Sequence, residues 1–177
     1  MITLKNNKMR KKKENLNKPP KSTYFSQNVE KLGPDFLKKK RADELKRDAI
    51  RVFKDIAHSK GYVGQIGTYF TNNYNFVKIM RESANTMIVE ENAIVLGLST
   101  YVKNMQDMGT QPDASVIHSL DAHKGKLKAL SILCTGFDNI LAIIDLNNTW
   151  DNIYKYVKVC GVLKSMSLQL KDYKYYL

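Results

Sequence analysis

Apolar residues recur at intervals of three and four along most of the chain, the spacing that places them on one side of an α-helix. The first such run follows the turn Gly33-Pro34-Asp35 and stops before Gly61, which predicts a helix over about residues 35–60. Its apolar side carries Leu45, Ala49, Val52, Phe53, Ile56 and Ala57.

Three further runs predict three more helices, over about residues 76–108, 113–146 and 149–171. Thr149 is a residue type that can cap the last of them. The second and third runs hold about 32 residues each, so each helix would extend for roughly 48 Å at 1.5 Å per residue. Helices of that length suit an elongated subunit that packs against copies of itself or against other proteins.

Glycine and proline mark the boundaries between these runs. Gly109 and the Pro112-Asp113 turn separate the second helix from the third. Gly125 lies inside the third run and could divide it into two helices, which keeps a helix-turn-helix interpretation open. The second half of that run is too apolar to suit a recognition helix in a DNA groove.

Residues 61–75 have a different composition, in which Gly61, Gly64 and Gly67 punctuate a series of aromatic residues. Each glycine penalises a helix by about 1 kcal/mol relative to alanine. We therefore expect a loop at 61–75, which could include a short extended pair.

The four helices, joined by short connections and without alternating strand patterns, predict an all-α fold, an elongated antiparallel helical bundle. We expect one helical domain over residues 24–177, preceded by a basic extended arm over residues 1–23.

The net charge of +12 is concentrated in this arm, where eight basic residues and one acidic residue give +7 and leave +5 for the remaining chain. The arm has too few apolar residues to offset its ordering entropy, so we expect it to be disordered or held by a partner. A lysine-rich arm suits a phosphate backbone of DNA or RNA, or an acidic protein groove, and a solubilising tail is the simpler alternative. Its basic residues are Lys5, Lys8, Arg10, Lys11, Lys12, Lys13, Lys18 and Lys21.

A second basic cluster follows at Lys38, Lys39, Lys40 and Arg41. Acidic residues follow it closely, so it is either an extension of the contact surface or the solvated side of a helix.

Two stretches rich in tyrosine are candidate contact surfaces, because tyrosine combines an apolar ring with a polar tip. We expect protein interfaces or core packing there, ahead of base stacking in single-stranded nucleic acid. The candidate interface aromatics are Tyr62, Tyr69, Phe70, Tyr74, Tyr173, Tyr175 and Tyr176.

The histidines and acidic residues do not form a pattern that predicts chemistry. His118 and His123 are five residues apart, off the spacing of a helical zinc pair, and no nucleophile or phosphate-loop motif is present. Glu90 and Glu91 are expected to be solvated or ion-paired, and Asp138 could meet a lysine or arginine of a neighbouring helix. We expect no enzyme activity, no metal and no cofactor.

The N-terminus lacks the apolar core of a secretion signal, and the most apolar stretch, residues 127–146, is interrupted by charged residues. We expect a core helix there, no membrane contact, and a location in the cytoplasm or within a virion. Cys134 and Cys160 predict two buried thiols and no disulfide.

These features predict a non-enzymatic structural subunit of a larger assembly, such as a phage virion or another nucleoprotein particle. Its helical body would pack on protein neighbours and its arm would contact nucleic acid or an acidic groove. The alternative is a free-standing accessory protein that binds nucleic acid through the arm and residues 38–41.

Overall fold

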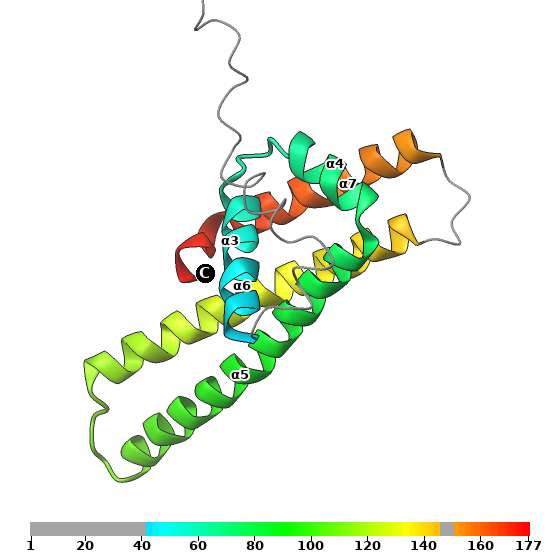
Figure 1. Cartoon of the computed structure of the whole chain (residues 1–177). Helices are drawn as coiled ribbons and strands as arrows, with labels where there is room; N and C mark the ends of the chain where they lie inside the picture. The colour runs from blue at the N-terminus through cyan, green and yellow to red at the C-terminus, as the bar shows by residue number, and fades with distance from the viewer. Residues whose placement is uncertain (1–41, 146–150) are drawn as a thin grey trace, which may run out of the picture.

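The computed structural model describes residues 42–145 and 151–177, and these residues are helical throughout apart from short connections (Figure 1). This confirms the all-α prediction for the described residues. The elements are α3 (Ala42–His58), α4 (Gly64–Asn72), α5 (Tyr74–Asp107), α6 (Ala114–Ile144) and α7 (Asn152–Gln169), followed by the single 3₁₀ turns η1 (Leu170–Asp172) and η2 (Lys174–Tyr176).

The long helices lie close to the predicted positions, with 34 residues in α5 and 31 in α6. Residues 35–41, the expected first turns of the first helix, lie outside the described residues, as does Thr149. The side chain of Asp151 caps α7 instead, because its Oδ1 accepts a hydrogen bond of 2.6 Å from the backbone N–H of Ile153. Gly61 and Gly109 follow the ends of α3 and α5 with φ of 84° and 69°, as expected of helix-terminating glycines.

The prediction of a loop over residues 61–75 is wrong, since α4 occupies residues 64–72. Gly67 is buried against α7, where a Cβ atom would collide with the Sγ of Cys160 and come within 3.3 Å of the Tyr156 ring. The glycine thus lets the two helices approach closely. Packing against α7 outweighs the weak helix propensity of this segment.

The helix α6 continues through Gly125 without a break, which rules out a helix-turn-helix at this position. A Cβ atom on Gly125 would lie 2.6 Å from the ring of Tyr176. The glycine therefore makes room for the C-terminal turn η2 on the surface of α6.

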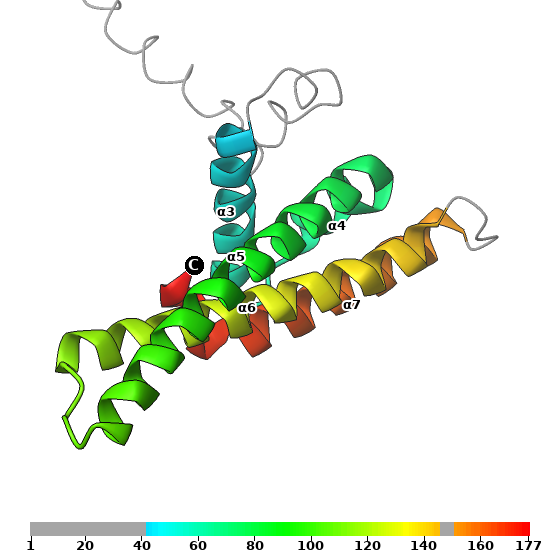
Figure 2. The ribbon, with the colours of Figure 1, turned by 90° about the horizontal axis from the view of Figure 1, so that it is seen from below.

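The helices α5 and α6 run antiparallel and form a long hairpin that is the main feature of the molecule. Its root is covered by α3, α4 and α7, whereas its tip extends beyond them, as Figure 1 and Figure 2 both show. α6 lies between α5 and α7, and the C-terminus folds back onto it.

The core lies at the root of the hairpin, where α3, α4, α5, α6 and α7 meet. Phe137 of α6 stands at its centre, with ring centroids 5.7 Å from Phe53 and 6.0 Å from Phe70. Phe70 also packs on Phe76, at 5.5 Å. The apolar side predicted for the first helix is confirmed, because Ala49, Val52, Phe53, Ile56 and Ala57 are all buried.

The close contact of α4 with α7 predicts opposite effects of adding one methyl group at two helical glycines. Gly67→Ala overpacks the contact and should lower the free energy of unfolding by about 1–3 kcal/mol. Gly97→Ala, on the open surface of α5, should raise it by about 0.5–1 kcal/mol. Urea denaturation followed by circular dichroism measures both, and equal stabilisation by the two variants would refute the packing described for α4.

Candidate functional site

The contact between α5 and α6 follows a heptad repeat, in which inward positions alternate at spacings of four and three residues. Nearly all of these positions hold apolar residues. On α5 they are Ala84, Ile88, Glu91, Val95, Leu98, Val102 and Met105, and on α6 they are Val116, Leu120, His123, Leu127, Leu130, Cys134, Phe137, Leu141 and Ile144.

Two of the inward positions hold polar, ionisable side chains: Glu91 on α5 and His123 on α6. The Nδ1 of His123 lies 2.7 Å from Oε2 of Glu91, and the Nζ of Lys126 hydrogen-bonds to Oε1 of the same carboxylate. The Glu91 side chain is only 5% exposed. Both carboxylate oxygens thus have a partner from α6.

The charge state of Glu91 follows from two opposing effects. Burial acts to raise the pKa of its carboxyl group, but the hydrogen bonds from Lys126 and His123 outweigh burial and hold the pKa below its ordinary value of 4.5. The carboxylate is therefore ionised at neutral pH, where a buried charge is stable because Lys126 supplies the opposite charge. Heptad spacing, applied to the whole of α5 and α6, would have placed Glu91 and His123 on facing sides.

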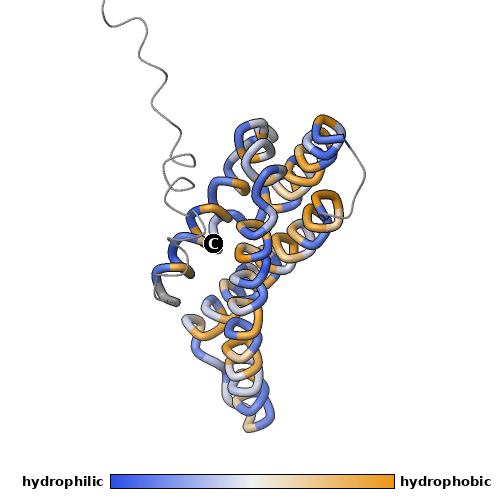
Figure 3. Tube along the Cα trace, turned by 45° about the vertical axis from the view of Figure 1, so that its right-hand side comes forward, coloured by the Kyte–Doolittle hydropathy of each residue, from blue (hydrophilic) through white to orange (hydrophobic). Residues whose placement is uncertain are grey.

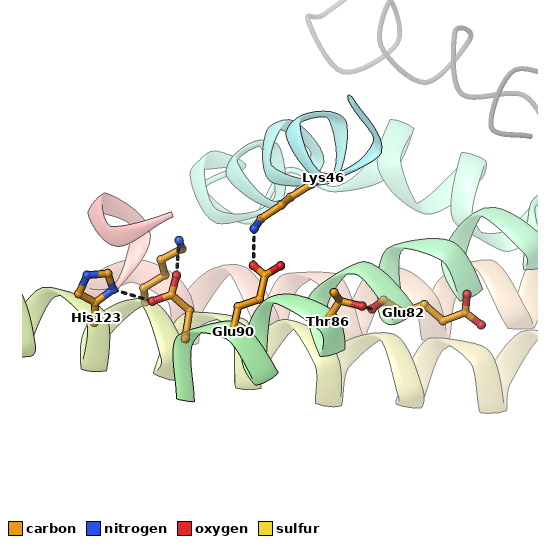
Figure 4. A network of polar contacts seen from close by, with 7 residues as sticks. Lys46, Glu82, Thr86, Glu90 and His123 are labelled. Atoms are coloured by element: carbon orange, nitrogen blue, oxygen red, sulfur yellow. Dashed lines mark hydrogen bonds and ion pairs between the residues drawn. The ribbon is translucent and has the colours of Figure 1, made fainter. Parts of the chain in front are cut away.

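Two further ion pairs involve Glu90 and Asp138, which were both expected to be ion-paired or solvated. Lys46 of α3 pairs with Glu90, as the close view in Figure 4 shows beside the His123 contact. Arg81 Nε donates to Oδ1 of Asp138 at 2.9 Å, which links α5 to α6 as expected for Asp138. Both pairs are exposed, so solvent screening makes each of them a weak contributor to stability.

The hairpin tip, residues 92–122, presents apolar side chains to solvent. Met87, Ile94, Tyr101 and Met108 follow one another at seven-residue spacing on one side of α5, and their exposed fractions rise from 2% to 41%, 46% and 68%. The same side is thus covered at the root and open at the tip, and Figure 3 shows hydrophobic positions continuing towards the tip.

The helix α7 carries a second exposed apolar surface on the side away from α4 and α6. This α7 outer face contains Tyr154, Val157 and Leu168, which are 44%, 58% and 62% exposed, and Ile153, 73% exposed, lies at its edge beside Thr68 and Asn72 of α4. The Nζ of Lys158 lies 5.1 Å from the centre of the Tyr154 ring. Gly161 lies on the same face, where a Cβ atom would meet no atom within 4 Å.

The predicted nucleic-acid or acidic-partner contacts, Lys5 to Lys21 and Lys38 to Arg41, all lie outside the described residues. The predicted interface aromatics divide into three groups. Tyr62, Tyr175 and Tyr176 are exposed at 74%, 82% and 42%. Tyr69, Tyr74 and Tyr173 are half-buried at the edge of the core, and Phe70 is fully buried.

Phe70 therefore follows the core-packing alternative and not the interface one. Its ring fills the space between Phe76 and Phe137, so it stabilises this chain and is not presented to a partner. The sequence around it did not reveal this because the expected loop hid the helical spacing of Ile66 and Phe70, which are both buried.

A groove between two helices and two free thiols are further candidate features of the described residues. A groove of about 290 Å³ between α6 and α7 has a mixed lining, in which Ser131, Thr135 and Ser165 lie beside the apolar Ile132, Val162 and Met166. Cys134 and Cys160 are free and half-buried, and burial raises the pKa of the Cys134 thiol. Among the described residues, no three histidine, cysteine or acidic side chains are grouped as metal ligands.

The Glu91 cluster predicts a pH-dependent contribution to stability. Because the pKa of Glu91 is lowered by folding, its stabilising effect is complete above pH 4.5 and is lost as the pH falls through the folded-state pKa. Glu91→Gln should lower the free energy of unfolding at pH 7 by about 1–3 kcal/mol, since Lys126 loses its counter-charge. The difference from wild type should shrink as the pH falls below about 4.

Urea denaturation at pH values between 3 and 7 measures this difference. Glu90→Gln, at the exposed neighbouring position, is the control and should change the stability at pH 7 by less than about 1 kcal/mol. A constant difference between wild type and Glu91→Gln down to pH 3 would contradict the described cluster.

Comparison with known proteins gives no relative: no family model matches the chain, and no curated protein or solved structure matches it. Of the described helices, α6 is long and apolar enough to cross a membrane by length and composition, a test that core helices of soluble proteins also pass. Eight residues of α6 are buried within this fold, Leu130 and Phe137 among them.

Proposed function

We propose that this chain is a non-enzymatic structural subunit of a larger assembly, such as a phage virion or another nucleoprotein particle. In this proposal the helices form an elongated antiparallel bundle that packs on protein neighbours. The basic arm, residues 1–23, contacts nucleic acid or an acidic groove.

The row from Met87 to Met108 is the observation that carries the proposal. A side of α5 that the chain's own helices cover at the root continues uncovered for three more heptad positions. Residues 92–102 of α5 also carry no charged side chain and are mostly apolar, and a helix that is hydrophobic on most sides is typical of a buried environment. The helix α6 covers one side of this segment, so a neighbouring protein would cover the others.

The charge distribution supports a second contact through the N-terminal part. Residues 1–41 contain thirteen basic and three acidic side chains, a net charge of +10, which leaves +2 for residues 42–177. The same observation favours the alternative, a free-standing nucleic-acid-binding accessory protein that uses the arm and residues 38–41. In that case the apolar hairpin tip would have no role in binding.

If the uncovered side of α5 packs on protein neighbours, the full chain should form oligomers of defined size, or join its particle, at about 0.15 M salt. Replacing Ile94 and Tyr101 by glutamine should weaken this association at least tenfold, because it removes apolar area from the uncovered row. Asn85→Gln, an exposed position nearer the root of α5, should leave association unchanged. Sedimentation velocity over a range of concentrations measures the association.

Nucleic-acid binding distinguishes the alternative. If the chain stays monomeric and binds DNA or RNA with an affinity that falls steeply with salt, the accessory function is favoured. Replacing Lys11, Lys12 and Lys13 by glutamine should then reduce the salt dependence by nearly one unit of log–log slope for each lost phosphate contact. A monomer that neither binds nucleic acid nor joins a particle would refute both proposals.

A further inference from the structure

The hairpin tip and the α7 outer face are both apolar, but they lie in segments of the chain with opposite net charge. Residues 92–122 contain one basic residue, Lys103, and three acidic residues, which gives a net charge of −2. The acidic residues are Asp107, Asp113 and Asp121. Residues 151–177 contain five lysines and two acidic residues, Asp151 and Asp172, which gives a side-chain charge of +3. Two surfaces of this kind on one chain are complementary to each other.

The side chains that surround each apolar surface are arranged to make use of this difference. On the α7 outer face, Lys158 and Lys164 are exposed on either side of Val157 and Leu168 by helical spacing. On the hairpin, Asp107 and Asp113 lie at the tip, next to the exposed Met108. An apolar centre with charged residues at its rim is the usual composition of a specific protein interface.

Other occupants of the hairpin tip fit less well. Insertion into a membrane would carry Lys103, Asp107 and Asp113 into hydrocarbon first, where charged side chains are strongly unfavourable. A nucleic acid would be repelled by the net negative charge. A basic, apolar protein surface remains, and the α7 outer face is one.

The two surfaces of a single chain cannot meet each other. α7 begins at the end of the molecule opposite the hairpin tip, as Figure 1 and Figure 2 both show. A contact between them must therefore join two copies. Because the surfaces differ, one copy keeps its α7 outer face free and the other keeps its hairpin tip free for further copies. Such a contact generates a ring or a filament.

We propose that the hairpin tip of one copy docks on the α7 outer face of a second copy of this chain. This inference rests on the proposed function as an assembly subunit and names the neighbour that the apolar row contacts. Gly161, which has no side chain on the docking face, allows a helix of the hairpin to approach the α7 backbone closely.

Two variants of the full chain test the pairing. The hairpin variant carries Ile94→Lys and Tyr101→Lys, and the α7 variant carries Val157→Glu and Lys158→Glu. Each should remain helical by circular dichroism and each should lose at least tenfold in association constant when alone. Asn85→Lys and Lys78→Glu make the same kinds of charge change on exposed positions of α5 nearer the root, and they should associate as wild type does.

Mixing the two variants in equal amounts is the decisive measurement. The hairpin variant keeps an intact α7 outer face, and the α7 variant keeps an intact hairpin tip, so the mixture should form dimers and nothing larger. Sedimentation velocity after nuclease treatment at about 0.15 M salt measures the species. Wild type under the same conditions should form larger species as its concentration rises.

Several results would overturn the proposal. If the α7 variant alone associates like wild type, then the hairpin tips pair with each other or with another surface. If wild type forms oligomers but the mixture stays monomeric, the pairing is refuted while the role as an assembly subunit stands. If wild type is monomeric at 100 µM, the pairing is refuted, and co-purification with a particle then decides the assembly function by itself.

Discussion

The heptad contact between α5 and α6 is the constraint on which the rest of the structure depends. Two helices of more than 30 residues contact each other along their whole length, and among the described residues this contact holds the tip together. At the root, the same pair offers a second side, on which Leu133 and Ile140 are fully buried. The shorter helices can be placed there because the long pair is already fixed.

The sequence predicted the long helices well because their spacing repeats many times and their ends carry strong local signals. Gly109 and the Pro112-Asp113 turn terminate α5 and start α6 within a residue or two of the expected positions. The helix α4 could not be predicted in the same way. Its nine residues give only two turns of spacing, and its glycines are favourable only because α7 lies against them.

The candidate site shows the same division between local and long-range information. The separation of His118 and His123 argued against a zinc pair, but it gave no partner for either residue. His123 contacts Glu91 from 32 positions away, and the facing positions follow only when the heptads of both helices are aligned antiparallel. Exposure of Ile94 and Tyr101 is equally invisible in a periodic pattern, which marks apolar sides without saying which of them are covered.

The acidic residue inside the α5–α6 contact also fixes the register of the two helices. Apolar heptads can slide past each other by seven residues at modest cost, whereas such a slip would bury the Glu91 charge against apolar side chains and leave His123 and Lys126 without it. The position of Glu91 along α5 therefore sets how far the tip stands from the core. Because the register is fixed at this cluster, the number of heptads beyond Glu91 sets the length of hairpin that extends past the core.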